Sequence, residues 1–188
     1  MKIGRLLLRL VVGGFFIGHG TQKLFGWFGG HGREATAQMF EQLGLRPGRH
    51  HALAAGTAET AGGALMLAGL ATPVAASTLT ATMLTAINRV HLKNGPWNTN
   101  GGYEYNVVLI AAALTLAEVG PGPLSIDSAL GDRTHGTGWA LAALLGGIGG
   151  AVGAHLYAES QRPPTPPAAP EPAPVAETTP AQQPQPVV

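Results

Sequence analysis

Five apolar stretches constrain the fold of this chain more than any other feature of its sequence. They cover about residues 3–28, 52–72, 74–92, 107–119 and 138–157. A helix needs ~20 apolar residues to cross the ~30 Å hydrocarbon layer of a bilayer, and the fourth stretch approaches that length when residues 103–106 are wound into it. Because backbone polar groups in lipid must be satisfied within the segment, the five stretches predict transmembrane helices.

Composition agrees with this interpretation. Charged residues make up 11% of the 188 residues, under half of the ~25% usual for soluble domains. A soluble all-α domain is the alternative, and the short connections and the lack of polar helix faces argue against it. The formal net charge of +1 gives no reason to expect a nucleic-acid partner. The chain has no cysteine, which excludes disulfides, CxxC redox chemistry and thiolate ligation of a metal by this protein.

The sequence divides into three parts. Residues 1–130 hold four of the apolar stretches and predict a four-helix transmembrane bundle. Residues 131–158 add a fifth, glycine-rich transmembrane helix, in which Gly146, Gly150 and Gly153 belong to GxxxG patterns that let helices approach closely and predict contact with a second copy of the chain. Residues 159–188 are rich in proline and are expected to be disordered.

The N-terminal stretch has a second interpretation. Lys2 and Arg5 followed by an apolar core are also typical of a secretory signal peptide. No A-x-A-like cleavage site follows, and the stretch continues into the ionisable residues His19 and Lys23. We therefore expect an uncleaved first membrane helix.

Ionisable residues inside the apolar stretches require partners. Arg9, His19 and Lys23 share the first stretch, where each charge costs ~2.5–3.5 kcal/mol on insertion scales. Glu59 is the carboxylate in the middle of an apolar stretch and is expected to pair with Arg9 or Lys23. Helical spacing supports this prediction. One face of the first helix carries Arg9, Gly13, Phe16, Gly20, Lys23 and Trp27, and one face of the second carries Ala52, Gly56, Glu59, Gly63 and Met66.

Two interpretations of these residues remain open. In one, the charges only hold the helices together, as polar pairs do in membranes. In the other, His19, Glu59, His91 and Glu104 line a polar pocket that binds a quinone head group, a small polar ligand or a metal, and that relays protons through histidine. A metal is disfavoured because the sequence offers no HxxH or ExxH spacing, and haem between His19 and His91 is disfavoured as well.

Several phrases together carry a family resemblance. They are residues 19–26 (HGTQKLFG), 59–63 (ETAGG), 69–73 (GLATP), 88–91 (NRVH), 102–106 (GYEYN) and 120–127 (GPGPLSID). With them, about residues 3–130 resemble the DoxX family of small bacterial and archaeal membrane proteins. The glycine-rich fifth stretch and the proline-rich tail lie outside this resemblance.

The resemblance implies a location and a function. The location is a multi-pass protein of the bacterial inner membrane, in contact with lipid. Relatives of this kind include a subunit of an archaeal terminal quinol oxidase, a subunit of a thiosulfate:quinone oxidoreductase, and a mycobacterial member of a complex with superoxide dismutase and a sulfurtransferase. We therefore expect a redox-associated, quinone-linked subunit or a membrane anchor of an oxidoreductase complex, with membrane or soluble redox proteins as partners. Without cysteine the chain is at most a non-catalytic or quinone-facing subunit. The alternatives are a non-enzymatic scaffold or assembly factor, and a protein that binds or transports a small molecule.

Overall fold

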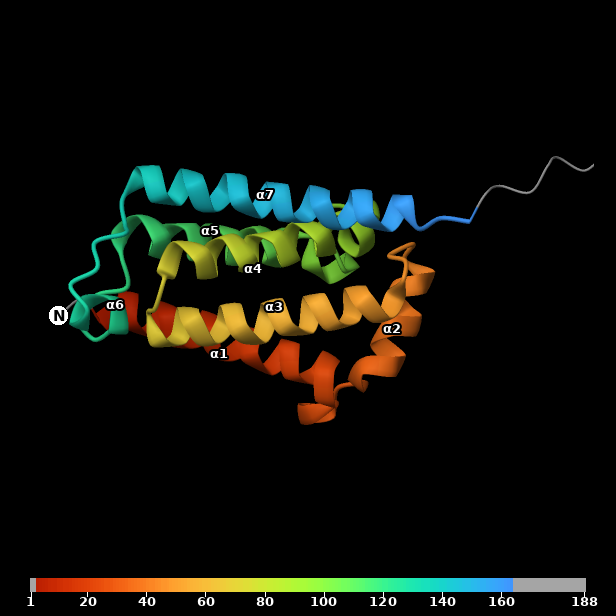
Figure 1. Ribbon diagram of the computed structural model, residues 1–188, viewed down its shortest axis with the longest axis horizontal. Helices are drawn as coiled ribbons and strands as arrows, with labels where there is room; N and C mark the ends of the chain where they lie inside the picture. The colour runs from red at the N-terminus through yellow and green to blue at the C-terminus, as the bar shows by residue number, and fades with distance from the viewer. Residues whose placement is uncertain (1–2, 164–188) are drawn as a thin grey trace, which may run out of the picture.

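The computed structural model describes residues 3–163, and over this range the chain is helical without strands. Its long helices are α1 (Ile3–Phe25), α3 (Gly48–Ala68), α4 (Thr72–Ala86), α5 (Glu104–Val119) and α7 (Thr137–Ser160). The shorter α2 (Gly32–Gln42) crosses one end of the bundle, and α6 (Ile126–Ala129) lies at the other end near the N-terminus (Figure 1). The predicted all-α bundle with an added helix is confirmed. Most of the tail that was expected to be disordered, residues 164–188, lies outside the described range.

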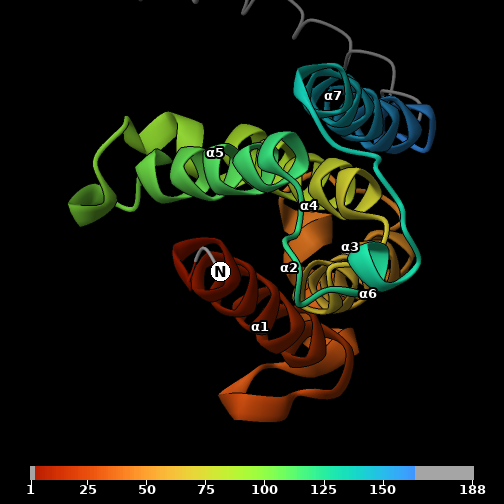
Figure 2. The same ribbon diagram turned by 90° about the vertical axis from the view of Figure 1, so that its left-hand side faces the viewer.

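The four predicted core helices pack in sequence order around the bundle. α1 packs on α3, α3 on α4, and α4 on α5, while α7 lies along α4 and α5. The end-on view shows α7 outside the group formed by the other four (Figure 2). α2 packs on α3 and contacts α1, so it closes the end of the bundle on which the α1–α2 and α4–α5 connections lie.

Glycines allow α1 and α3 to meet backbone to backbone. A Cβ atom added to Gly13 would lie 2.7 Å from the carbonyl oxygen of Gly63, and one added to Gly63 would lie 2.7 Å from that of Gly13. Gly20 and Gly56 repeat this close approach about two helical turns further along the seam. The helix faces predicted from the spacing therefore do form the seam between α1 and α3, although Trp27 lies beyond the end of α1 and is exposed.

The glycines of α7 contact the same chain. A Cβ atom on Gly146 would lie 2.5 Å from Ser77 Oγ, and one on Gly150 would lie 3.0 Å from the Cβ atom of Ala81. Both partners belong to α4. Gly146 and Gly150, for which the sequence predicts contact with a second copy, thus pack against α4 of the same chain. Gly153 has nothing within 4 Å of its added Cβ atom.

Fewer helices than predicted have the length and hydropathy of a membrane span. Within residues 3–163, two helices are long and apolar enough to cross a membrane, α1 and α7. α4 has 15 residues and α5 has 16, which is short of a full span. α3 has 21 residues but is rich in glycine, threonine and histidine and carries Glu59.

Candidate functional site

A cavity of about 300 Å³ lies at the end of the bundle that α2 crosses. Its walls are largely apolar and come from α1, α2, α4 and α5: Phe15, Phe16, Met39, Phe40, Met83 and Leu109. A few polar side chains interrupt these walls: His19, Lys23, Glu59, Arg89, His91 and Asn106. An apolar pocket of at least ~300 Å³ with a few convergent polar groups is typical of a small-molecule site. We refer to it below as the Glu59 cavity.

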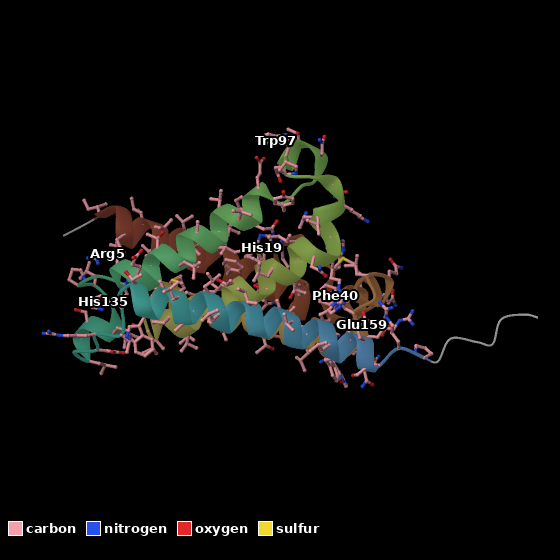
Figure 3. All side chains as sticks on the ribbon, turned by 90° about the horizontal axis from the view of Figure 1, so that it is seen from above. Arg5, His19, Phe40, Trp97, His135 and Glu159 are labelled. Atoms are coloured by element: carbon pink, nitrogen blue, oxygen red, sulfur yellow. The ribbon has the colours of Figure 1, made fainter. Side chains whose placement is uncertain are left out.

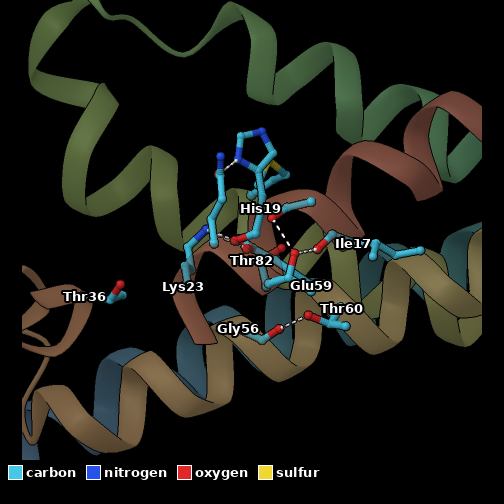
Figure 4. A network of polar contacts seen from close by, with 12 residues as sticks. Ile17, His19, Lys23, Thr36, Gly56, Glu59, Thr60 and Thr82 are labelled. Carbon is cyan, nitrogen blue, oxygen red and sulfur yellow. Dashed lines mark hydrogen bonds and ion pairs between the residues drawn. The ribbon is translucent and has the colours of Figure 1, made fainter. Parts of the chain in front are cut away.

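An ion pair between α1 and α3 lies in the wall of the Glu59 cavity. Lys23 Nζ is 2.6 Å from Glu59 Oε2 (Figure 4), and the two side chains are 23% and 6% exposed. Lys23 Nζ also donates a longer hydrogen bond, 3.4 Å, to the carbonyl oxygen of His19. The small residues of the seam, Gly20 and Gly56, bring the helices close enough for this pair to form. Because Lys23 remains partly exposed, one side of the pair stays open to a ligand.

His19 lies at the rim of the cavity, one helical turn before Lys23. Its Nδ1 atom is 3.1 Å from Gln22 Oε1, and Gln22 Nε2 donates to the carbonyl oxygen of Phe28 at 3.2 Å. Gln22 therefore ties the imidazole ring to the turn that follows α1. The ring lies on the same side of α1 as Lys23 (Figure 4).

A π-helical turn places the polar residues at the end of α4. The regular helix ends at Ala86, and residues Ile87–His91 form the π turn η2. Single π turns are frequent at functional sites. This turn brings Arg89 and His91 to the Glu59 cavity, where His91 Nδ1 is 2.8 Å from the carbonyl oxygen of Gly101.

The sequence prediction missed Arg89 as a lining residue. Arg89 joins the cavity to α7, because Nη2 lies 3.8 Å from Glu159 Oε1 and contacts His155 Nδ1. Its side chain is 12% exposed. The available signal was an arginine at the end of an apolar stretch, with a histidine and a carboxylate near the end of the fifth one.

The structure places Glu104 outside the Glu59 cavity. Its Oε1 atom accepts a hydrogen bond from the backbone N–H of Asn98 at 2.7 Å, which orders the loop before α5. The following residues, Tyr105 and Asn106, line the cavity instead. Asn106 is buried, and its Nδ2 atom lies 3.3 Å from Met83 Sδ. Of the four residues proposed for a polar pocket, the structure brings together His19, Glu59 and His91.

Arg9 lies far from Glu59, at the opposite end of α1. It precedes Lys23 by almost four helical turns, or ~21 Å along the axis. Its guanidinium group is buried and donates to the carbonyl oxygen of Pro121 at 2.8 Å and to that of Leu124. The pairing of Arg9 with Glu59, one of the two predicted options, is therefore wrong, and Lys23 is the partner of Glu59.

Glu59 also lines a second cavity of about 340 Å³ between α3, α4 and α7. This cavity shares Phe40, Leu45, Glu59 and Thr85 with the first one. Its remaining walls are made mainly of small residues of the three helices, which leave the space between them. Among residues 3–163, no group of three or more histidine, aspartate and glutamate residues has the geometry to hold a metal ion.

Comparisons with known proteins agree with the sequence resemblance. A family model described as DoxX matches residues 4–92, from the start of α1 to the end of the π turn. A relative from Bacillus subtilis (strain 168), named "Putative oxidoreductase CatD", is 34% identical over 126 residues, which cover 67% of this chain and 86% of the relative. No solved structure gives a significant match. The chain therefore belongs to the DoxX family of membrane proteins.

Proposed function

We propose that this protein is a multi-pass protein of the bacterial inner membrane and a redox-associated subunit that holds a quinone head group in the Glu59 cavity. The name of the Bacillus subtilis relative, which includes the word oxidoreductase, supports the redox association. The partner that supplies or takes electrons would be another protein, because this chain has no cysteine for redox chemistry of its own.

The distribution of apolar and polar side chains supports a multi-pass arrangement. Large apolar residues are exposed on every long helix, including those too short or too polar to qualify as spans alone: Leu7, Val11, Leu53, Leu67, Val74, Val107, Val108, Leu141, Leu145 and Leu156. The buried residues include Arg9, Glu59, Thr72, Thr80 and Asn106. An exposed apolar surface of this size is typical of contact with lipid or with another protein. Lipid around the whole bundle would cover it, with α4 lengthened by its π turn.

The Lys23–Glu59 pair in an apolar wall is the observation that carries the proposed ligand. A quinone head group is a flat, apolar ring with two carbonyl oxygens. The apolar walls suit the ring, and the partly exposed Lys23 ammonium can donate to a carbonyl oxygen. Reduction to the quinol takes two electrons and two protons. Glu59 and His19 line the same cavity and would pass the protons, while the electrons would come from the redox partner.

The second cavity on Glu59 supports a ligand with a tail. Because it adjoins the first cavity at Phe40, Leu45 and Glu59, a head group beside Lys23 can extend an apolar chain towards α7. The small residues there leave a slot between α3, α4 and α7. We therefore expect a ligand that combines a ring with a prenyl chain.

Binding of ubiquinone-1 to the purified protein tests the proposal. Leu109→Trp fills the Glu59 cavity with a larger side chain and is expected to lower the affinity for ubiquinone-1 about tenfold, or ~1.4 kcal/mol. Leu145→Trp, on the exposed face of α7, is the matched control and should bind as the wild type does. Mass spectrometry of lipids extracted from the wild type should detect a co-purifying quinone. Absence of a co-purifying quinone, together with equal binding by both variants, would contradict the proposal.

A membrane scaffold is the second candidate function, and the outer face of α7 favours it. Gly149 and Gly153 have nothing within 4 Å of an added Cβ atom and lie among exposed apolar residues such as Leu145 and Leu156. Such a pair is suited to contact with a helix of another chain. Crosslinking in intact membranes should then give dimers that Gly153→Leu removes. A monomer in both the wild type and the variant would count against this function.

A further inference from the structure

A separate, polar cavity lies at the end of the bundle opposite to the Glu59 cavity. It has a volume of about 360 Å³ and is formed by the connection between α5 and α7 together with the start of α1. The basic residues Arg5, Arg133 and His135 line it. Figure 3 shows Arg5 and His135 near one another at this end, where α7 begins. We refer to it as the Arg5 cavity.

Two glycines of the connection let the basic side chains lie against its backbone. Gly120 and Gly122 have φ values of 78° and 91°, a region that favours glycine. A Cβ atom on Gly120 would be 3.0 Å from Cγ of His135, and one on Gly122 would be 3.1 Å from Nε of Arg5. The loop therefore holds the imidazole ring and the guanidinium group at the cavity wall.

The nearby carboxylates are engaged with other groups. Asp132 lines the cavity, but its oxygens accept hydrogen bonds from the N–H of Thr134 at 2.9 Å and from its hydroxyl at 3.0 Å. Asp127 accepts from the N–H of Ala71 at 2.8 Å and from the hydroxyl of Thr72 at 3.0 Å. Both acids therefore stabilise the backbone and leave the basic groups of the cavity without a direct counter-charge.

The arginines of the cavity retain unused donors. Arg5 Nη1 donates to the carbonyl oxygen of Val119 at 2.6 Å, while its buried Nε atom has no hydrogen-bond partner among residues 3–163. In the same described range neither Arg5 nor Arg133 forms an ion pair with a carboxylate. Positive charge and free N–H groups around a cavity suit an anion, which accepts short charge-assisted hydrogen bonds from them.

The surroundings of the Arg5 cavity suit the boundary between lipid and water. Exposed apolar side chains flank it on the α5–α7 connection and at the start of α7: Leu124, Ile126, Leu130 and Trp139. Tryptophan is enriched at the level of lipid head groups, and basic residues there attract anionic lipids. Apolar anchors beside a basic cavity would place the cavity at the depth of the phosphates.

We infer that the Arg5 cavity binds the phosphate group of an anionic phospholipid. Arg5, Arg133 and His135 hold the phosphate oxygens, and the flanking apolar side chains contact the acyl chains. Free inorganic phosphate has the same chemistry and is the other source of such a group. The site shares no residue with the Glu59 cavity, so this inference does not depend on quinone binding.

Native mass spectrometry of the full-length protein, purified in mild detergent and stripped of lipid, tests the inference. The probes are short-chain phosphatidylglycerol and phosphatidylcholine, whose choline group cancels the charge of its phosphate. We expect tighter binding of phosphatidylglycerol, reduced about fivefold by Arg133→Gln and also reduced by Arg5→Gln. Lys93→Gln removes a positive charge from an exposed residue at the other end of the bundle and should leave binding unchanged.

The variants separate an effect on folding from one on binding. Arg5 also donates a hydrogen bond to the backbone of α5, so Arg5→Gln can impair folding. In that case the exposed Arg133 alone provides the test, through Arg133→Gln. Displacement of phosphatidylglycerol by millimolar inorganic phosphate would assign the site to free phosphate and overturn the lipid inference. Phosphatidylglycerol that stays bound under this competition supports the inference. Equal binding of the two lipids, or equal losses in Arg133→Gln and Lys93→Gln, would overturn it.

Discussion

Each buried ionised side chain of the bundle is matched by a nearby partner. Glu59 meets Lys23 at 2.6 Å, and Arg9 donates to the carbonyl oxygen of Pro121 at 2.8 Å. Asp127 accepts from backbone N–H groups at the start of α4 and holds Ala71 at a φ of 47°, which is unusual for a residue with a side chain. Because an unpaired buried charge costs several kcal/mol, removal of one partner lowers the free energy of unfolding by the cost of leaving the other group unpaired.

The partner of Glu59 can be identified by a double-mutant cycle. Glu59→Gln leaves Lys23 unpaired and is expected to lower the free energy of unfolding by about 3–5 kcal/mol. Lys23→Met combined with Glu59→Gln removes both charges and should recover most of this loss, measured by SDS titration in mixed micelles. Arg9→Gln combined with Glu59→Gln is the matched control and should recover none. Additive effects of Lys23→Met and Glu59→Gln would show that the two residues do not interact.

The sequence predicts which residues are buried better than it predicts their partners. Glu59 could be placed inside the bundle because it follows the helical spacing of Gly56 and Gly63. The partner of Arg9 could not be predicted, since it is a carbonyl group more than a hundred positions along the chain and carries no side-chain signature. The charge of Glu104 predicts a place in the polar pocket. In the structure its carboxylate, at the first turn of α5, accepts a hydrogen bond from the N–H of Asn98 instead.

Among the helices, α1 and α3 form the closest pair, and glycine is the reason. The contact at Gly13 and Gly63 brings main-chain atoms together without an intervening side chain. The neighbouring Gly14 has nothing within 4 Å of an added Cβ atom. Two adjacent residues of the same helix therefore differ only in whether α3 lies against them.

This difference gives a paired prediction. Gly13→Ala places a methyl group 2.7 Å from Gly63 O and from Leu67 N. The helices have to separate, at a cost of about 1–3 kcal/mol in the free energy of unfolding. Gly14→Ala should be neutral or stabilise the helix by up to ~1 kcal/mol, because alanine has the higher helix propensity. Thermal unfolding followed by circular dichroism compares the two, and equal melting temperatures would contradict the assigned seam.

Helix pairing shows where sequence patterns stop being informative. Spacing predicts that Gly146 and Gly150 lie on a close-packed face, but it does not say which helix covers that face. The structure assigns α4 of the same chain, with Ser77 and Ala81 opposite the two glycines. The π turn after Ala86 also has no simple sequence pattern, and its last residue, His91, contacts the carbonyl oxygen of Gly101 in the following loop.

The whole molecule has an apolar outside and a partly polar interior, and its depth in the membrane can be measured. The chain has no cysteine, so single cysteines can be introduced without background. Asn100→Cys and Ser128→Cys lie at opposite ends of the bundle and should react with a membrane-impermeant maleimide, each from one side of the membrane. Val108→Cys and Leu145→Cys lie at positions that are also exposed in the protein, 61% and 68%, but should react only after solubilisation. Rapid labelling of Leu145→Cys in intact membranes would contradict the multi-pass arrangement.

The backbone contact between α1 and α3 has a mechanical consequence for the Glu59 cavity. With glycine on both sides at Gly13 and Gly63, no rotamer change can loosen the seam, so the two helices move as one stiff body. Met39 of α2 and Met83 of α4 line the cavity with unbranched, flexible side chains, which adapt more readily than the glycine seam. A ligand held there as proposed would gain passage by rotation of methionine side chains, and its rate of exchange would depend on how fast those side chains reorient.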